Sequence, residues 1–156
     1  MKNIFLLLII LISIFGCGTP MPNTYRMLDT SYKEHIDDNY AIICVYYPED
    51  LSVQAPCYVL EDGNRVSVIK QGTYTEIKSK KGTHIYALEN DSHIMPKVFI
   101  DANIKTVYYL KAGQVSDFLT AHATLELSTR ESAMSQLPIL KKIINSYLPM
   151  PKRRRL

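Results

Sequence analysis

The chain has 156 residues, is 47% hydrophobic and carries a formal net charge of +3, values typical of a single globular domain. Five of its 18 Lys and Arg residues lie near the ends, namely Lys2, Lys152, Arg153, Arg154 and Arg155, which leaves 13 in the body against 15 Asp and Glu. Because a nucleic-acid-binding domain needs a basic face on its fold, this charge distribution argues against nucleic acid as a partner.

The N-terminal segment has the organisation of an export signal. Lys2 precedes an apolar run from Ile4 to Phe15 that ends at Gly16 and Cys17, and the run is shorter than the roughly 20 residues that span a bilayer. With a cysteine directly after the cut, the segment resembles a bacterial lipoprotein signal. The resemblance implies that residues 1–16 are removed, that Cys17 is lipidated and that the protein is anchored in the cell envelope. The residue after the cysteine is Gly18, whereas the signal that retains such lipoproteins in the inner membrane has Asp there. The resemblance therefore favours the outer membrane, with the protein facing the periplasm.

Composition divides the remaining chain into three parts. Residues 17–38 contain two prolines and mixed charges without periodicity, so we expect a flexible tether after the lipidated cysteine. Residues 39–148 are expected to form the folded domain, including a C-terminal helix. Residues 149–156 are expected to be a disordered basic tail, or a segment that contacts anionic lipid head groups.

The folded part begins with short apolar or alternating runs separated by turn residues. The predicted strands are 40–47, 57–61, 64–69, 73–78, 83–89, 97–102, 105–111 and 118–127. This spacing indicates an antiparallel β-sandwich of about seven to eight strands, mainly β in class. The first strand, Tyr40 to Tyr47, is apolar on both faces and is therefore expected to lie centrally in a sheet.

Two turns are expected to form hairpins. Asp62 and Gly63 lie between two strand-like runs and suit a two-residue type I′ turn, whose central residues need positive φ. The segment from Ser79 to Gly82 joins the next two strands, with Gly82 at the position where a bulged hairpin takes a left-handed residue.

After Leu127 the periodicity becomes helical. Ser128 with Glu131 matches a capping box, which predicts a helix over residues 129–137. Residues 139–148 place Ile143, Ile144 and other apolar side chains on one face, which predicts a second, amphipathic helix that begins after Pro138. That helix is expected to cover an open side or end of the sandwich; the alternative is contact with a membrane or a partner.

Several local patterns together resemble a group of small bacterial lipoproteins of unknown function with a single β-sandwich domain. The patterns are the lipobox at Cys17, the tyrosine-rich strand 40–47, the Asp62-Gly63 hairpin, and the segments 71–74, 81–84 and 107–110. The resemblance covers roughly residues 40–112. It implies a fold and a location, and it supplies no catalytic residues.

Cys44 and Cys57 are the cysteines that remain after lipidation of Cys17. An even pair in an oxidising compartment favours a disulfide, provided that the first strand turns back through residues 48–56 and places the two residues opposite each other. The alternative is two reduced, buried cysteines that pack as small hydrophobic side chains.

No arrangement of residues predicts a cofactor, a metal site or an enzyme. His35, His84, His93 and His122 lack metal-ligand spacing, and Ser67 and Ser116 lack a nucleophile motif. Residues 89–93 are rich in oxygen ligands but lack the spacing of a calcium loop.

The leading hypothesis from sequence is therefore a lipid-anchored, non-catalytic envelope protein that binds another envelope protein or forms part of an assembly. The alternatives are a periplasmic small-ligand carrier and a periplasmic enzyme whose site the sequence does not reveal. Loops on a rigid sandwich are the usual place for recognition. The predicted partner-binding loops are 48–56 and 90–96, with Glu49, Asp50, Leu51, Asp91 and Met95 as contacts.

Overall fold

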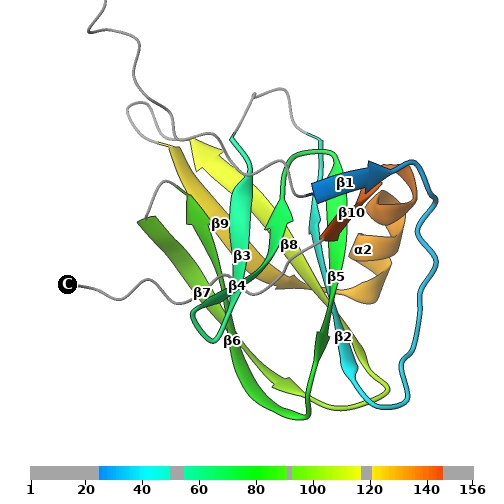
Figure 1. Cartoon of the computed structure of the whole chain (residues 1–156). Helices are drawn as coiled ribbons and strands as arrows, with labels where there is room; N and C mark the ends of the chain where they lie inside the picture. The colour runs from blue at the N-terminus through cyan, green and yellow to red at the C-terminus, as the bar shows by residue number, and fades with distance from the viewer. Residues whose placement is uncertain (1–24, 50–54, 91–92, 117–120, 146–156) are drawn as a thin grey trace, which may run out of the picture.

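The computed structural model describes residues 25–49, 55–90, 93–116 and 121–145, which form two packed β-sheets and one helical segment (Figure 1). The strands are β1 (Tyr25–Leu28), β2 (Ala41–Tyr47), β3 (Cys57–Glu61), β4 (Asn64–Ile69), β5 (Thr73–Ser79), β6 (Gly82–Asn90), β7 (His93–Ala102), β8 (Val107–Ser116), β9 (Ala121–Ser128) and β10 (Lys141–Asn145). Helix α2 (Arg130–Gln136) leads into a short 3₁₀ helix (Leu137–Ile139).

Sheet A contains six strands in the order β1-β10-β5-β2-β8-β9, and sheet B contains four in the order β4-β3-β6-β7. The predicted β-sandwich is confirmed, and β2 to β9 correspond to the eight strands expected from sequence. A core of apolar side chains fills the space between the sheets, among them Ile43 and Val45 of β2, Val59 of β3, and Leu88 of β6.

Strand β2 lies at the centre of sheet A, as its sequence predicts. It pairs antiparallel with β5 and parallel with β8, and all seven of its residues are buried. Alternate residues of a strand point to opposite faces, so both faces of β2 need an apolar cover. Ile43 and Val45 meet the core between the sheets, whereas Cys44 and Tyr46 point to the outer face.

A second apolar cluster covers that outer face of sheet A. It consists of Tyr32, Cys44, Tyr46, Tyr74, Tyr109, Ala133, Leu137 and Leu140. Helix α2 supplies part of the cover, and the segment that follows β1 supplies Tyr32, whose ring packs edge-on against Tyr74 at 5.2 Å between centroids. The hydroxyl of Tyr109 and the guanidinium of Arg130 both donate to the carboxylate of Glu34, which fastens this segment to the sheet and the helix.

The tether expected over residues 17–38 is wrong for its second half. Residues 25–28 form β1, which pairs antiparallel with β10, and Tyr32 is buried in the outer cluster. The sequence did not predict this strand, because neither β1 nor the segment after it has a periodic pattern of apolar residues. Residues 17–24 lie outside the described part of the chain.

The Asp62-Gly63 hairpin is confirmed. Asp62 has φ 51° and Gly63 has φ 78°, and the turn connects the antiparallel strands β3 and β4. The second expected hairpin is wrong, because β5 and β6 belong to different sheets and the turn from Ser79 to Gly82 carries the chain from one to the other. Strand β5 pairs with β2 over its whole length and with β10 at Thr73 and Tyr74, whereas β6 pairs with β3 and β7 of sheet B.

The helix expected over 129–137 is confirmed with its cap shifted by one residue. Thr129, not Ser128, is the N-cap, and its hydroxyl accepts the Ser132 N–H at 3.2 Å. The Ser128 hydroxyl is instead bonded to the Tyr46 hydroxyl at 2.7 Å.

The second helix, expected over 139–148, is wrong, because residues 141–145 form strand β10. The strand pairs parallel with β5 and antiparallel with β1, and the Lys142 ammonium contacts the Glu76 carboxylate. A short apolar run of β-branched residues fits both periods, and here the open edge of β5 decides in favour of a strand.

A pair of substitutions distinguishes this strand from the amphipathic helix. Ile143 is 2% exposed and Ile144 is 40% exposed, whereas a helix would bury both on one face. We expect Ile143→Ala to lower the free energy of unfolding by about 2–5 kcal/mol because it leaves a cavity, and Ile144→Ala to lower it by well under half as much. Urea unfolding of the two variants measures the difference, and equal losses would contradict the strand.

Candidate functional site

A cleft lies in sheet A where β2 ends and its neighbour β8 continues. The parallel pairing of these strands stops at Tyr46 and Lys111, while β8 goes on beside β9 as far as Ser116. The cleft, called the β8 notch here, has a volume of about 380 Å³. It is lined by Tyr47, Pro48, Glu49, Lys111, Ala112, Gly113, Gln114, Val115, Thr124 and Glu126.

The β8 notch has a mixed lining with an acidic excess. Lys111 lies 3.7 Å from a carboxylate oxygen of Glu126, so that pair is neutral as a whole, and Glu49 adds a further negative charge. Glu49 lies against the β4–β5 turn, where its side chain is 3.2 Å from the position that a Cβ on Gly72 would take. The notch therefore offers one ion pair and one additional carboxylate to a ligand.

Gly113 allows β8 and the Thr124 side chain of β9 to lie close together at the notch. A Cβ at this position would lie 2.9 Å from the Oγ1 of Thr124 on the neighbouring strand β9. A glycine inside a strand often marks a close approach of this kind. That signal in the sequence points to the notch, although sequence analysis missed Lys111, Gly113, Thr124 and Glu126 as lining residues.

Of the predicted partner contacts that the structure describes, Glu49 is the one that lies at the notch. Glu49 lines it, whereas Asp50, Leu51 and Asp91 lie outside the described residues. Met95 is part of β7, which begins at His93, so the predicted loop 90–96 is wrong for its second half.

Of the two alternatives that the sequence left open for Cys44 and Cys57, the structure shows the second: both are buried, and they form no disulfide. Cys44 is in sheet A and points into the outer cluster, whereas Cys57 is in sheet B and points into the core between the sheets. The chain between β2 and β3 crosses to the other sheet instead of turning back to pair with β2. Burial raises the pKa of the Cys44 thiol, and the charge of Glu76 raises it further. Cys17 lies outside the described residues.

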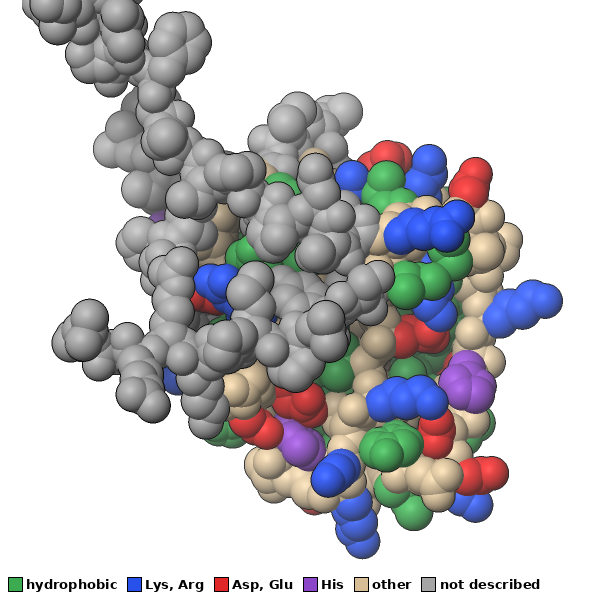
Figure 2. Space-filling model, viewed as in Figure 1, with side chains coloured by type: hydrophobic (Ala, Val, Ile, Leu, Met, Phe, Trp, Pro, Cys, Tyr) green, Lys and Arg blue, Asp and Glu red, His purple; other side chains and the backbone are tan. Residues whose placement is uncertain are grey.

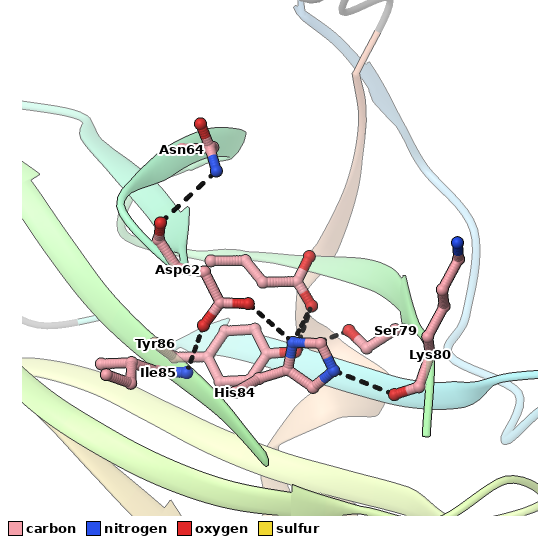
Figure 3. A network of polar contacts seen from close by, with 8 residues as sticks. Asp62, Asn64, Ser79, Lys80, His84, Ile85 and Tyr86 are labelled. Carbon is pink, nitrogen blue, oxygen red and sulfur yellow. Dashed lines mark hydrogen bonds and ion pairs between the residues drawn. The ribbon is translucent and has the colours of Figure 1, made fainter. Parts of the chain in front are cut away.

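A polar network surrounds His84, away from the residues that line the β8 notch (Figure 3). The Nδ1 of His84 is 2.8 Å from a carboxylate oxygen of Asp62 and 3.4 Å from one of Glu61, and its Nε2 is 3.0 Å from the carbonyl oxygen of Lys80. The other oxygen of Asp62 accepts the Ile85 N–H at 2.9 Å. Both ring nitrogens thus face acceptors, which the protonated imidazolium satisfies with two donors.

Tyr86 extends this network into the core. Its hydroxyl donates to Glu61 at 2.7 Å, so the Ser79 hydroxyl, 2.5 Å away, donates to the Tyr86 oxygen. Ser79 belongs to sheet A and Tyr86 to sheet B, and the bond therefore ties the two sheets together where the chain crosses between them.

The surroundings of His84 favour its charged form. Burial acts to lower the pKa of His84, but the hydrogen bonds to Asp62 and Lys80 and the charges of Glu61 and Asp62 outweigh it and raise the pKa. The Ile85 N–H, and then the hydrogen bond and charge of His84, lower the pKa of Asp62 despite some desolvation. With both ring nitrogens engaged, His84 braces the β3–β4 turn against β6 and has no nitrogen directed at an outside substrate.

A second hollow lies over sheet B. It has a volume of about 330 Å³ and is lined by Leu60, Asp62, Gly63, Ile85, Ala87 and Lys97. On the face shown in Figure 2, the described Lys and Arg side chains are interspersed with Asp and Glu and form no single basic patch. Among the described residues, no group of three His, Cys, Asp or Glu side chains is arranged to hold a metal ion.

Within the described part of the chain, no helix has the length and apolarity needed to cross a membrane. The sequence matches no family model, no curated protein and no solved structure. The geometry described above is therefore the basis for the functional argument.

The His84 network predicts a pH dependence of stability. Because the folded-state pKa of His84 is raised, its contribution is complete below the unfolded pKa of about 6.5 and is lost as the pH rises through the folded pKa. We expect the melting-temperature difference between the wild type and His84→Gln to be largest near pH 5.5 and to shrink towards pH 9.

Asp62→Asn provides the matched background for this measurement. In that background the nearer of the two carboxylates beside His84 is gone and Glu61 remains, so the pH dependence of the effect of His84→Gln should become smaller without vanishing. A difference that is constant with pH, or that grows as the pH rises, would contradict the assigned brace.

Proposed function

We propose that this chain is a lipid-anchored protein of a bacterial cell envelope whose β-sandwich is a non-catalytic binding module. The partner is another envelope protein, and it binds at the β8 notch. The observation that carries the binding site is the notch itself, an open cleft formed by the ends of strands that the core of the sandwich holds rigidly.

The anchor rests on the sequence. Lys2, the apolar run to Phe15 and the pair Gly16-Cys17 resemble a lipoprotein signal, and the resemblance assigns the lipid to Cys17 and the location to the outer membrane, facing the periplasm. Two or three acyl chains hold a protein firmly, because each buried methylene contributes about 0.8 kcal/mol.

The start of β1 limits where such a module works. If Cys17 carries the lipid, the eight residues 17–24 separate the anchor from Tyr25, the first residue of β1. Eight extended residues reach at most about 28 Å. The domain then stays within that distance of the bilayer surface, which favours a partner that is itself in or on the membrane.

The polar groups in the body of the domain support binding more than catalysis. Cys44 is buried with a raised thiol pKa, which keeps it protonated and unreactive. Both nitrogens of His84 face acceptors within the protein. The volume of the β8 notch also lies within the range of small-ligand pockets, so a small-ligand carrier is the second candidate.

The anchor predicts the behaviour of one variant. We expect Cys17→Ser to remain an unprocessed, unlipidated precursor, because both lipid attachment and the cut require the thiol. Intact mass and detergent partitioning of the protein purified from its own host measure this. A wild-type protein whose mass includes no lipid, and which partitions into the aqueous phase, would contradict lipidation at Cys17.

The binding site predicts a position-dependent cross-link. A photoreactive amino acid at Val115, which is 55% exposed in the β8 notch, should give a defined protein adduct in the native bacterium. The matched control is Ile104, which is 42% exposed in the β7–β8 connection at the opposite end of β8.

Two further variants define the surface. Glu49→Lys in the notch should weaken the Val115 adduct, whereas Glu131→Lys on helix α2 should leave it unchanged. Equal adducts from Val115 and Ile104, or none from Val115, would contradict a partner site at the notch.

A further inference from the structure

The backbone of β8 has an edge that the described strands leave unpaired over its last five residues. The Ile42 N–H of β2 donates to the Thr106 carbonyl at 2.9 Å, and the parallel pairing then runs from Ile42 with Val107 to Tyr46 with Lys111. On its other side β8 pairs with β9 as far as Ser116. Within the described residues, no strand continues β2 alongside residues 112–116.

The direction of the backbone groups at this edge follows from the pairing. N–H and C=O groups of successive strand residues point to opposite sides, and the Thr106 carbonyl points to β2. Even-numbered residues of β8 therefore direct their backbone groups towards β2 and, beyond it, into the β8 notch. Gln114 presents an N–H and a carbonyl there, and Ala112 presents its carbonyl, whereas Gly113 and Val115 direct theirs to β9.

Pro48 explains why β2 does not continue the pairing. In the register of the two strands, position 48 follows on opposite Gly113, where its N–H would reach the Ala112 carbonyl. Proline has no N–H, so this hydrogen bond is not available to it. The sequence thus ends the β2 ladder at the point where the notch begins.

We propose that the β8 notch binds an extended segment of the partner protein, which adds as a strand to β8 in line with β2. This inference rests on the proposed function and specifies the partner at the same site. Strand addition gives affinity through main-chain hydrogen bonds and selectivity through alternate side chains. Five strand residues span roughly 13–17 Å, so the segment is short.

The lining determines the chemistry of that segment. Lys111, Gly113 and Val115 are on the outer face of β8, and the inner face carries Ala112 and Gln114 beside Tyr47. Lys111 and Glu126 neutralise each other, so Glu49 leaves the notch with a net negative charge. The added strand accordingly carries a Lys or Arg that meets Glu49, and an apolar side chain that meets Val115.

Amide hydrogen exchange of the isolated mature chain tests the notch without a partner. We expect the Gln114 N–H to exchange at least tenfold faster than the N–H groups of Gly113 and Val115, which face β9 in the same strand. Protection of Gln114 equal to that of its two neighbours would mean that the chain fills its own notch, and the proposal would be overturned.

The cross-link at Val115 tests strand addition itself. Gln114→Pro removes the N–H that faces the notch and spares the groups that face β9, a position where strands tolerate proline. We expect it to reduce the adduct at least tenfold. Gln114→Ala keeps the backbone donor and should leave the adduct within twofold of the wild type, with melting temperatures of both variants recorded to verify folding.

The outcomes separate this inference from the proposed function. An adduct that survives Gln114→Pro in a folded protein, or that Gln114→Ala abolishes as well, shows a side-chain interface and overturns strand addition alone. Fast exchange at Gln114 together with no adduct at Val115 overturns the proposed function, and strand addition with it. If Gln114→Pro does not fold, we compare amide exchange of the Gln114 N–H in the wild-type protein with and without the cross-linked partner. Strand addition requires this N–H to be protected from exchange when the partner is present and unprotected when it is absent, and any other result overturns it.

Discussion

The burial of β2 on both faces is the constraint on which the rest of the structure depends. All seven of its residues are buried, and a sheet that lies against sheet B on one side needs a second cover on the other. Tyr32, helix α2 and the 3₁₀ helix provide that cover, and this explains why the chain before β2 and the chain after β9 both fold back over sheet A. The Glu34 carboxylate, which accepts from Tyr109 and Arg130, connects the two parts of the cover to each other.

Local signals in the sequence predicted strands β2 to β9. They did not predict which distant segments pair with each other. The Asp62-Gly63 turn and β2 to β9 follow from turn chemistry and apolar alternation, both of which act within a few residues. Strands β1 and β10 depend on each other across more than a hundred residues, and on the edge of β5, so neither has a strong signal of its own. The same long-range choice sends β6 to the other sheet and separates Cys44 from Cys57.

The candidate site was predictable only in part, for related reasons. Glu49 was expected because it follows a buried strand at the start of a loop. Lys111, Thr124 and Glu126 can be recognised as lining residues only when it is known that β8 extends beyond the end of β2. Gly113 carried a usable signal, since glycine inside a strand marks a close approach. His84 and Asp62 are 22 residues apart and meet because Asp62 closes a turn that lies against β6.

The remaining sheet edges give a reason to regard the β8 notch as a binding feature. Exposed edges invite pairing with other chains, and proteins keep them short or cover them. Here β1 has only four residues, β7 packs alongside β9, and β4 packs near β5, so the outer edges of both sheets are short or flanked. The unpaired part of β8 is different, because it is recessed between Pro48 and β9 within sheet A. A recess of this kind admits a single strand but not the edge of another sheet, and so it permits binding without exposing the protein to edge-to-edge aggregation.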